Sequence, residues 1–521
     1  MGPITATEKG EPVTRQINAS TLLGVTEPGM SGVVSFRGLP FAQAPTGELR
    51  WRPPQPRSLP SGEVDATRFA PACPQDNGNH QWYADVAAAF GRPASTVPAL
   101  PETSEDCLYL NIWAPGKLEQ KPLPVMVWIH GGSNVNGWSF EPDYRGASLA
   151  ARGVVVVSIA YRLGALGFLA HPDLSAESPL GVSGNYGLLD QIAALKWLQQ
   201  NIAEFGGDPG NITVFGESAG AADILYLMTT PLTKGLFHKA IVQSGGYGAD
   251  LDRNLEKNEQ IGLALTKALG IPEDNPLPAM RQVPADTLVN TAASALGGHY
   301  WDGTLDGLIF PHSPAASFAR GLAHPVPIII GSNRNESLMY LDEGPNDKPL
   351  QKAIESVDER HRKTLGELLS NGHPKDKRRQ LDRLSSAQDM LCPSQFVARS
   401  LAAARVPAYA YYFTRVRPGG DSIGAYHGAE ISYAFGSKPD WLPTDQRDLA
   451  LSEVMGDYWT SFARNGAPES PGNPAWPSFQ VDMPRYLELG DTTSTGESLE
   501  HELCRILDLT RTHRLLNQGE Y

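Results

Sequence analysis

Ser218 stands in the sequence Gly216-Glu217-Ser218-Ala219-Gly220, a Gly-x-Ser-x-Gly pattern that is typical of a serine nucleophile. An apolar run at residues 212–215 precedes it and predicts a buried strand, and small residues that suit a helix follow it. The chemistry needs this strand–turn–helix context, because a strained turn exposes the serine oxygen. Glycines at both ends permit the tight turn, where a side chain would collide with the backbone. The alternative interpretation is an ordinary Gly/Ser turn.

A serine nucleophile requires a general base and an acid that orients it, and in strand–turn–helix hydrolases both follow the serine in the chain. We predict His427 as the base, because it lies among small residues in GAYHGAE (424–430), shortly after a predicted strand at 408–416. The alternative is a histidine with a structural role. Four other downstream histidines, near prolines or in charged helical runs, are expected at the surface: His312, His324, His361 and His373.

We predict Glu336 as the acid, because it lies in a loop that directly follows a predicted buried strand at 326–330. A carboxylate at a strand end is well placed to hold the distal N–H of an imidazole. The alternative is a glutamate that interacts with a helix N-terminus.

The sequence His130-Gly131-Gly132-Ser133 follows a predicted strand at 123–129 and suits an oxyanion loop. Residues with little or no side chain let backbone N–H groups converge on one oxygen. The predicted donors are Gly132, Ser133 and Ala219, and the alternative for the loop is a plain glycine turn. Ser244 also follows a strand, but no glycine stands two residues before it, so we interpret it as structural.

The elements that must position these residues alternate between strands and helices. Strands are predicted at 123–129, 154–159, 212–215, 239–243, 326–330 and 408–416, and helices at 187–202 and 449–463. Residues 342–386 are predicted to form a charged, helical, solvated cap, and residues 73–107 a long loop with little periodicity. This order predicts a large, mainly parallel α/β sheet flanked by helices, in a single domain over 1–521.

Composition limits the partners and the compartment. The 521 residues carry a formal net charge of −14, which argues against a nucleic-acid partner, and no apolar run reaches the length of a membrane span. The four cysteines show no metal-site spacing, so two disulfides in an oxidising compartment are expected, and four buried free thiols are the alternative. The polar residues 1–20 lack the apolar core of a signal peptide. If the chain is exported, we therefore expect that its leader has been removed.

Taken together, these stretches resemble the type-B carboxylesterase/cholinesterase family of the α/β-hydrolases, over nearly the whole length. The matching motifs are FRGLPFA (36–42), EDCLYLNIW (105–113), HGG (130–132), YRLGALGF (161–168), GNYGLLDQ (184–191), FGGDP (205–209), FGESAG (215–220) and YHGAE (426–430).

The resemblance implies an α/β-hydrolase fold with helical cap insertions and a triad of Ser218, Glu336 and His427. It implies oxyanion donors from Gly132, Ser133 and Ala219, with Glu217 lining the substrate pocket. It also implies the disulfides Cys73–Cys107 and Cys392–Cys504 and an Arg50–Glu105 ion pair with a structural role. The expected protein is a secreted or periplasmic carboxylesterase of bacterial type, with small-molecule esters as substrates and no metal or organic cofactor.

Two departures from the family pattern affect specificity. The third oxyanion residue is usually Gly or Ala, and Ser133 adds a hydroxyl that is expected to alter acyl-group preference. The choline-binding tryptophan has no match, because Trp82 lies at a different distance from Cys107, so acetylcholine is not expected as a substrate. Two alternatives remain: a detoxifying esterase of bulky natural-product polyesters (fumonisin-type, releasing tricarballylate), and a non-catalytic adhesion domain of the same fold.

Overall fold

The computed structural model describes residues 10–250, 253–297 and 299–517 of the chain. The outermost residues of the predicted domain, 1–9 and 518–521, lie outside the described residues. The strands are β1 (Pro12–Ile17), β2 (Ser20–Thr26), β3 (Val33–Pro40), β4 (Gly62–Asp65), β5 (Tyr109–Pro115), β6 (Leu123–Ile129), β7 (Val155–Ile159), β8 (Gly207–Glu217), β9 (Lys239–Gln243), β10 (Ile328–Asn333), β11 (Ala408–Phe413), β12 (Arg485–Leu489) and β13 (Thr493–Glu497).

These strands form one large sheet in the order β1-β2-β3-β5-β7-β6-β8-β9-β10-β11-β12-β13, with β4 paired to β2. From β7 to β12 neighbouring strands run parallel, whereas β1, β2, β3, β5 and β13 pair antiparallel with their neighbours along this order. The mostly parallel sheet that the sequence predicts is therefore confirmed, and the antiparallel edges are features that the prediction did not include.

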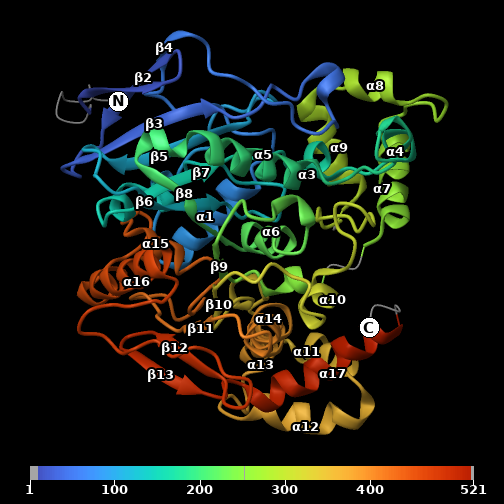
Figure 1. Cartoon of the computed structure of the whole chain (residues 1–521). Coiled ribbons are helices and arrows are strands. Elements are labelled where there is room, and N and C mark those ends of the chain that lie inside the picture. The colour runs from blue at the N-terminus through green and yellow to red at the C-terminus, as the bar shows by residue number, and fades with distance from the viewer. Residues whose placement is uncertain (1–9, 251–252, 298, 518–521) are drawn as a thin grey trace.

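The helices are α1 (Gly78–Ala89), α2 (Ala147–Ala150), α3 (Gly164–Phe168), α4 (Pro172–Glu177), α5 (Tyr186–Asn201), α6 (Ala219–Leu227), α7 (Leu255–Ala268), α8 (Leu277–Gln282), α9 (Ala285–Ala295), α10 (Pro314–Ala319), α11 (Asp347–Glu355), α12 (Glu359–Ser370), α13 (Lys377–Ser386), α14 (Cys392–Ala403), α15 (Ile431–Phe435), α16 (Gln446–Asn465) and α17 (His501–Asn517). In Figure 1 the helices of the first half of the chain gather in its upper part, and the cap helices and α17 lie at the bottom.

Helices cover both faces of the sheet, and β6 shows why its sequence is apolar throughout. Val125, Val127 and Ile129 pack into the core that includes α5 and α6, while Met126 and Trp128 pack into the core that includes α15 and α16. Successive side chains of a strand point to opposite faces, so a strand covered on both sides must be apolar at every position. Because both faces of β6 are packed against helices, the end of this strand, where the site lies, is held firmly in place.

The helical cap predicted at 342–386 consists of α11, α12 and α13 and has a small core of its own. Leu365, Leu369 and Leu384 are fully buried there, together with Leu503 and Ile506 of α17. Figure 1 shows the red α17 beside the orange α12, although they are far apart in the sequence. The cap is therefore solvated only on its outer face.

The structure corrects three details of the sequence prediction. Residues 73–107 include the helix α1, which the weak periodicity did not reveal. The strand predicted at 326–330 is β10 and extends to Asn333, so Glu336 follows the strand end more closely than expected. His324, expected at the surface, is half-buried, and its Nε2 lies 2.8 Å from the Thr230 carbonyl oxygen.

Candidate active site

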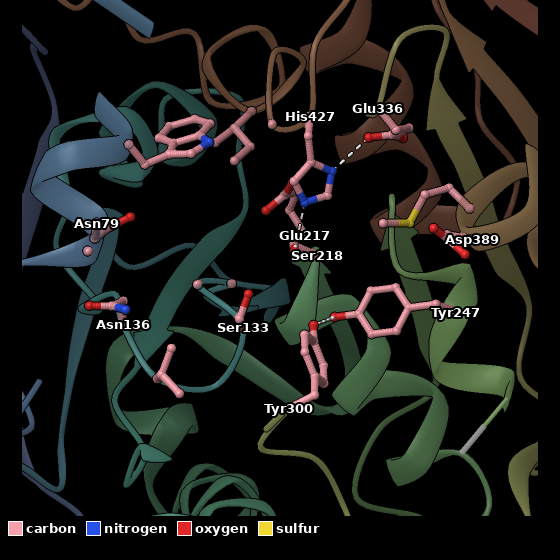
Figure 2. Close-up of a pocket in the computed structure, with 18 of the residues that line it drawn as sticks. Asn79, Ser133, Asn136, Glu217, Ser218, Tyr247, Tyr300, Glu336, Asp389 and His427 are labelled. Carbon is pink, nitrogen blue, oxygen red and sulfur yellow. Dashed lines mark hydrogen bonds and ion pairs between the residues drawn. The ribbon is translucent and has the colours of Figure 1, made fainter. Parts of the chain in front are cut away.

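Three loops at one edge of the sheet bring Ser218, Glu336 and His427 together (Figure 2). Ser218 follows β8, Glu336 follows β10 and His427 lies in the loop after β11, and β8, β9, β10 and β11 are consecutive parallel strands. The carboxyl ends of parallel strands meet at the same edge, where α/β proteins place their ligand sites. The predicted convergence of residues 218, 336 and 427 is thus a consequence of the sheet order.

Ser218 occupies a sharp turn between β8 and α6 with a strained backbone (φ 54°, ψ −124°). A Cβ atom at Gly220 would lie 2.1 Å from the Ile129 carbonyl oxygen, and one at Gly216 would lie 2.7 Å from that same oxygen. Both glycines are therefore required by close backbone approach. A non-glycine residue in this conformation costs about 1–3 kcal/mol, which the surrounding structure must offset.

A continuous hydrogen-bond chain links the three side chains. His427 Nε2 lies 2.8 Å from Ser218 Oγ, and His427 Nδ1 lies 2.7 Å from Glu336 Oε2. Because a carboxylate accepts, Nδ1–H donates to Glu336, and Nε2 is left with a lone pair for the Ser218 hydroxyl proton. In this arrangement the serine can lose its proton to the imidazole.

Two asparagines lock the Glu336 loop to the His427 loop. Asn333 Nδ2 donates to the Tyr426 carbonyl oxygen at 2.8 Å, and Asn335 Oδ1 accepts from the Ala425 N–H at 3.1 Å. Asp382, on the cap helix α13, in turn accepts from Asn335 Nδ2 at 2.8 Å. These positioning residues were not predicted, because loop asparagines and a cap aspartate carry no recognisable sequence signal.

The loop after β6 passes directly against Ser218. A Cβ atom at Gly131 would lie 3.0 Å from Ser218 Cβ, so only glycine permits this approach. Gly132, Ser133 and Asn134 all have positive φ (94°, 56° and 57°), which curls the loop beside Ser218. Such a curl turns consecutive backbone N–H groups into a concavity that suits an anion, and Ala219 at the start of α6 adds a helix N-terminus.

Asn134, the last residue of this curl, is held by buried groups. Its Nδ2 donates to Asp223 Oδ1 at 3.2 Å, and its Oδ1 accepts from the Tyr161 hydroxyl at 3.1 Å. Burial raises the pKa of Asp223 to about 8, and Gln191 bonds its other oxygen at 2.5 Å. Asp223 thus supports this loop, a role that no pattern in the sequence predicted.

Glu217 lies beside the hydrogen-bond chain and changes its electrostatics. Its Oε1 lies 3.4 Å from His427 Nε2, and its side chain is buried. Burial raises the pKa of Glu217 above its usual value. Burial lowers the pKa of His427, but the carboxylates of Glu217, Glu336 and Glu430 outweigh burial and raise that pKa above the usual 6.5.

Ser218 opens into a cavity of about 740 Å³, which the predicted pocket residue Glu217 also lines. Trp82, on α1, lines the cavity as well, and its Nε1 donates to the Tyr340 hydroxyl at 2.9 Å. Gly428, next to His427, lies against the Trp82 ring, since a Cβ atom there would be 3.4 Å from Cη2. From the sequence, Trp82 was a candidate only for choline binding. In the structure it forms part of the cavity wall, because it lies on α1, a helix that the sequence did not predict.

Six carboxylate side chains line this cavity: Glu141, Glu217, Asp250, Asp302, Glu336 and Asp389. Some of them have partners outside it, because Arg511 of α17 pairs with Asp250 at 2.8 Å and the Tyr226 hydroxyl donates to Asp302 at 2.5 Å. Among the described residues that line the cavity, Arg253 is the one arginine or lysine. The cavity therefore favours neutral or cationic groups over anionic ones.

The cysteines form the pairs that the family resemblance implies. The disulfides Cys73–Cys107 and Cys392–Cys504 are both present. The expected ion pair is present too: Arg50 Nε and Nη2 donate to Glu105 at 2.8 and 2.5 Å, away from the cavity.

The described residues include no cluster of three or more His, Cys, Asp or Glu side chains that could hold a metal ion. Within the same residues, no helix has the length and apolarity that crossing a bilayer requires.

Comparisons with known proteins agree on one family. Residues 12–507 match the model of the Carboxylesterase family. The chain is 35% identical to a fumonisin B1 esterase of Sphingopyxis macrogoltabida, covering 95% of this chain and 90% of that protein, and 34% identical to the human cocaine esterase, covering 90% and 86%. Among solved structures, a PNB esterase (TM-score 0.80, 31% identity) and a Geobacillus stearothermophilus carboxylesterase (TM-score 0.81, 29% identity) each match over 95% of this chain and 99% of theirs.

Proposed function

Because the chain belongs to the Carboxylesterase family, it is a carboxylic ester hydrolase, and we propose that Ser218, His427 and Glu336 form its catalytic triad. The observation that carries this proposal is the unbroken chain of hydrogen bonds from Ser218 Oγ through the imidazole to Glu336, at 2.8 and 2.7 Å.

In the acylation step Ser218 Oγ attacks the ester carbonyl carbon while His427 Nε2 takes the hydroxyl proton. The resulting imidazolium is stabilised by Glu336, and it then donates its proton to the leaving alkoxide as the carbon–oxygen bond breaks. A water molecule attacks the acyl-enzyme in the same way, with His427 again as the base. The products are a carboxylic acid and an alcohol.

The negative charge of the tetrahedral intermediate falls on the former carbonyl oxygen. We assign its stabilisation to the backbone N–H groups of Gly132, Ser133 and Ala219, in the curl that lies against Ser218. Fixed donors of this kind act without reorganisation, and each is typically worth about 3–4 kcal/mol of transition-state stabilisation. The same complete arrangement argues against the alternative of a non-catalytic adhesion domain, which has no need of an aligned serine and histidine.

A second candidate is hydrolysis of bulky polycarboxylate esters. The 35% identical relative named fumonisin B1 esterase favours it. The cavity opposes it, because six carboxylates line it and Arg253 is the one arginine or lysine among the described lining residues. Like charges in a partly desolvated cavity repel strongly, so neutral esters are the better fit.

The disulfides support an exported enzyme, because such bonds persist in oxidising compartments. We place the protein in the periplasm or outside the cell, as one domain that acts on small-molecule esters. The net charge of −14 supports the absence of a nucleic-acid partner.

A panel of esters with one alcohol tests this function. Methyl esters of neutral acids of increasing length are compared with methyl hemisuccinate and monomethyl tricarballylate, by pH-stat titration. We expect turnover of the neutral esters, at least tenfold lower kcat/KM for the anionic ones, and no turnover by Ser218→Ala. Faster hydrolysis of the tricarballylate ester would favour the second candidate, and activity in the Ser218 variant would contradict the triad.

A further inference from the structure

Three hydroxyl groups lie together on the side of Ser218 that faces away from His427 (Figure 2). They belong to Ser133 of the oxyanion loop, Tyr247 and Tyr300, and all three residues line the cavity. Tyr247 belongs to the short turn after β9, and Tyr300 to the loop between α9 and α10. No part of the proposed ester chemistry uses these side chains, since Ser133 contributes only its backbone N–H.

The hydroxyls form a chain. The Tyr300 and Tyr247 oxygens are 2.9 Å apart, and the two rings stand nearly perpendicular (88°) with centroids at 5.9 Å. Ser133 is the third member, because its side chain lies close enough to Tyr300 to lower the pKa of that hydroxyl. Arg253 fixes the backbone of Tyr300 by donating to its carbonyl oxygen at 2.9 Å.

Both tyrosines stay protonated, so the chain has a definite number of donors. Burial, and next the charge of Asp302, raise the pKa of Tyr300, and burial raises that of Tyr247. The Tyr300 hydroxyl donates to the Tyr247 oxygen at 2.9 Å, so this bond uses the Tyr300 proton. The Tyr247 proton is then left for a substrate oxygen, and the Ser133 hydroxyl offers a lone pair as well as a proton.

The position of the chain identifies the part of the substrate that it meets. The leaving alcohol oxygen must come within reach of His427 Nε2, which protonates it, so the alcohol lies on the His427 side of Ser218. The acyl remainder must then extend to the other side, where Ser133, Tyr300 and Tyr247 line the cavity.

We propose that the hydroxyl chain of Ser133, Tyr300 and Tyr247 is an acyl-side subsite that selects esters whose acyl group carries a neutral oxygen, a hydroxyl or a ketone, close to the reacting carbonyl. This proposal rests on the proposed function of Ser218. A ketone oxygen on the acyl group can accept the Tyr247 proton. A hydroxyl on the acyl group can either accept that proton or donate its own to the Ser133 oxygen. Anionic oxygen is disfavoured, because Asp302, two residues from Tyr300, also lines the cavity and its charge acts on the Tyr300 hydroxyl.

Unsubstituted acyl groups are still accepted, because Tyr300 and Tyr247 bond each other when no substrate oxygen is present. The expected preference is therefore moderate, about tenfold, rather than the much larger factor of sites whose polar groups would be left unpaired.

The test compares matched ethyl esters: ethyl butyrate with each enantiomer of ethyl 3-hydroxybutyrate, and ethyl propionate with each enantiomer of ethyl lactate. For the wild type we expect kcat/KM about tenfold higher for at least one hydroxy ester than for its unsubstituted partner. Tyr300→Phe and Tyr247→Phe should bring this ratio close to one and leave kcat/KM for the unsubstituted esters within about threefold.

Tyr409→Phe is the matched control, because this tyrosine packs against Phe462 and Trp476 outside the cavity and should leave the ratio unchanged. Equal kcat/KM for both members of every pair in the wild type would overturn the subsite. An equal loss on both members in the tyrosine variants would overturn it too, because the chain would then support the oxyanion loop rather than read the acyl group. If the proposed triad is wrong, Ser218→Ala will still hydrolyse ethyl butyrate. This outcome contradicts the triad and is distinct from the outcomes that contradict the subsite.

Discussion

Glu336 holds His427 through one carboxylate oxygen and is itself held through the other. Oε2 lies 2.7 Å from His427 Nδ1, and Oε1 accepts the backbone N–H of Asn333 at 2.6 Å. Asn333 is the last residue of β10, so the central sheet fixes the position of Glu336 and, through Glu336, the orientation of the imidazole. This fixed carboxylate keeps the Nε2 lone pair of His427 directed at Ser218.

Glu336→Gln should lower kcat by about 10³–10⁴ and change KM little, since an amide can present its NH₂ group to Nδ1 and stabilise the tautomer whose Nε2 carries the proton. Steady-state kinetics on ethyl butyrate measure the effect. Glu453→Gln, at an exposed residue of α16 far from the cavity, is the control and should behave as the wild type. A Glu336→Gln enzyme with the wild-type kcat would assign the orienting role to another group.

Glu217 should control the pH dependence of activity. His427 must be neutral to accept the Ser218 proton, so kcat/KM rises with pH through a midpoint that the neighbouring carboxylates place above the usual 6.5. Glu217→Gln removes the strongest charge that raises this pKa, so the midpoint should move to lower pH. The wild-type midpoint describes the joint titration of His427 and Glu217 and not of His427 alone, because burial also raises the pKa of Glu217. A pH–rate profile that is unchanged or moves to higher pH in the variant would contradict this account.

The residues that could be predicted from the sequence are those whose backbone context is itself distinctive. Ser218 could be predicted because its flanking glycines are required by approaches as close as 2.1 Å, and the loop at 130–133 because Gly131 packs against Ser218. His427 and Glu336 were found because they follow strands of the parallel sheet. In each case a local steric or topological requirement restricts which residues can occupy the position, and this restriction can be recognised in the sequence.

The residues that were missed act through tertiary contacts. Trp82 faces the cavity because α1 folds inside the Cys73–Cys107 loop, and α1 lacks a clear amphipathic pattern. Tyr300 lies in a loop with no regular secondary structure, more than 80 residues beyond Ser218, and no local pattern connects the two. The shape and charge of the cavity therefore had to come from the structure.

Ser133→Gly should keep kcat on ethyl butyrate within about threefold of the wild type, because the backbone N–H remains and the positive φ of 56° suits glycine. Proline is not a suitable test of this N–H, because its φ of about −65° is incompatible with the curl. A loss of 10²-fold or more in Ser133→Gly would mean that the hydroxyl, and not the N–H, stabilises the oxyanion.

Each disulfide should contribute to stability by an amount that grows with the logarithm of the length of the loop it closes. The paired cysteines are 34 and 112 positions apart in the sequence, so loop entropy predicts losses of about 4 and about 5 kcal/mol in the free energy of unfolding for the double alanine variants Cys73→Ala/Cys107→Ala and Cys392→Ala/Cys504→Ala, respectively. Urea unfolding measures these losses. Thiol titration of the denatured, non-reduced protein should find no free thiol, and four reactive thiols would contradict both the pairing and the oxidising compartment.

The central claim is that Ser218 is the nucleophile, and stoichiometric labelling with a fluorophosphonate tests it most directly. Such a probe reacts with a serine only when a base activates it, and peptide mapping by mass spectrometry identifies the modified residue. We expect one label per chain on the peptide that contains Ser218, loss of ester hydrolysis in parallel with labelling, and no label in Ser218→Ala. A label on another serine, or equal labelling of the alanine variant, would contradict the assignment.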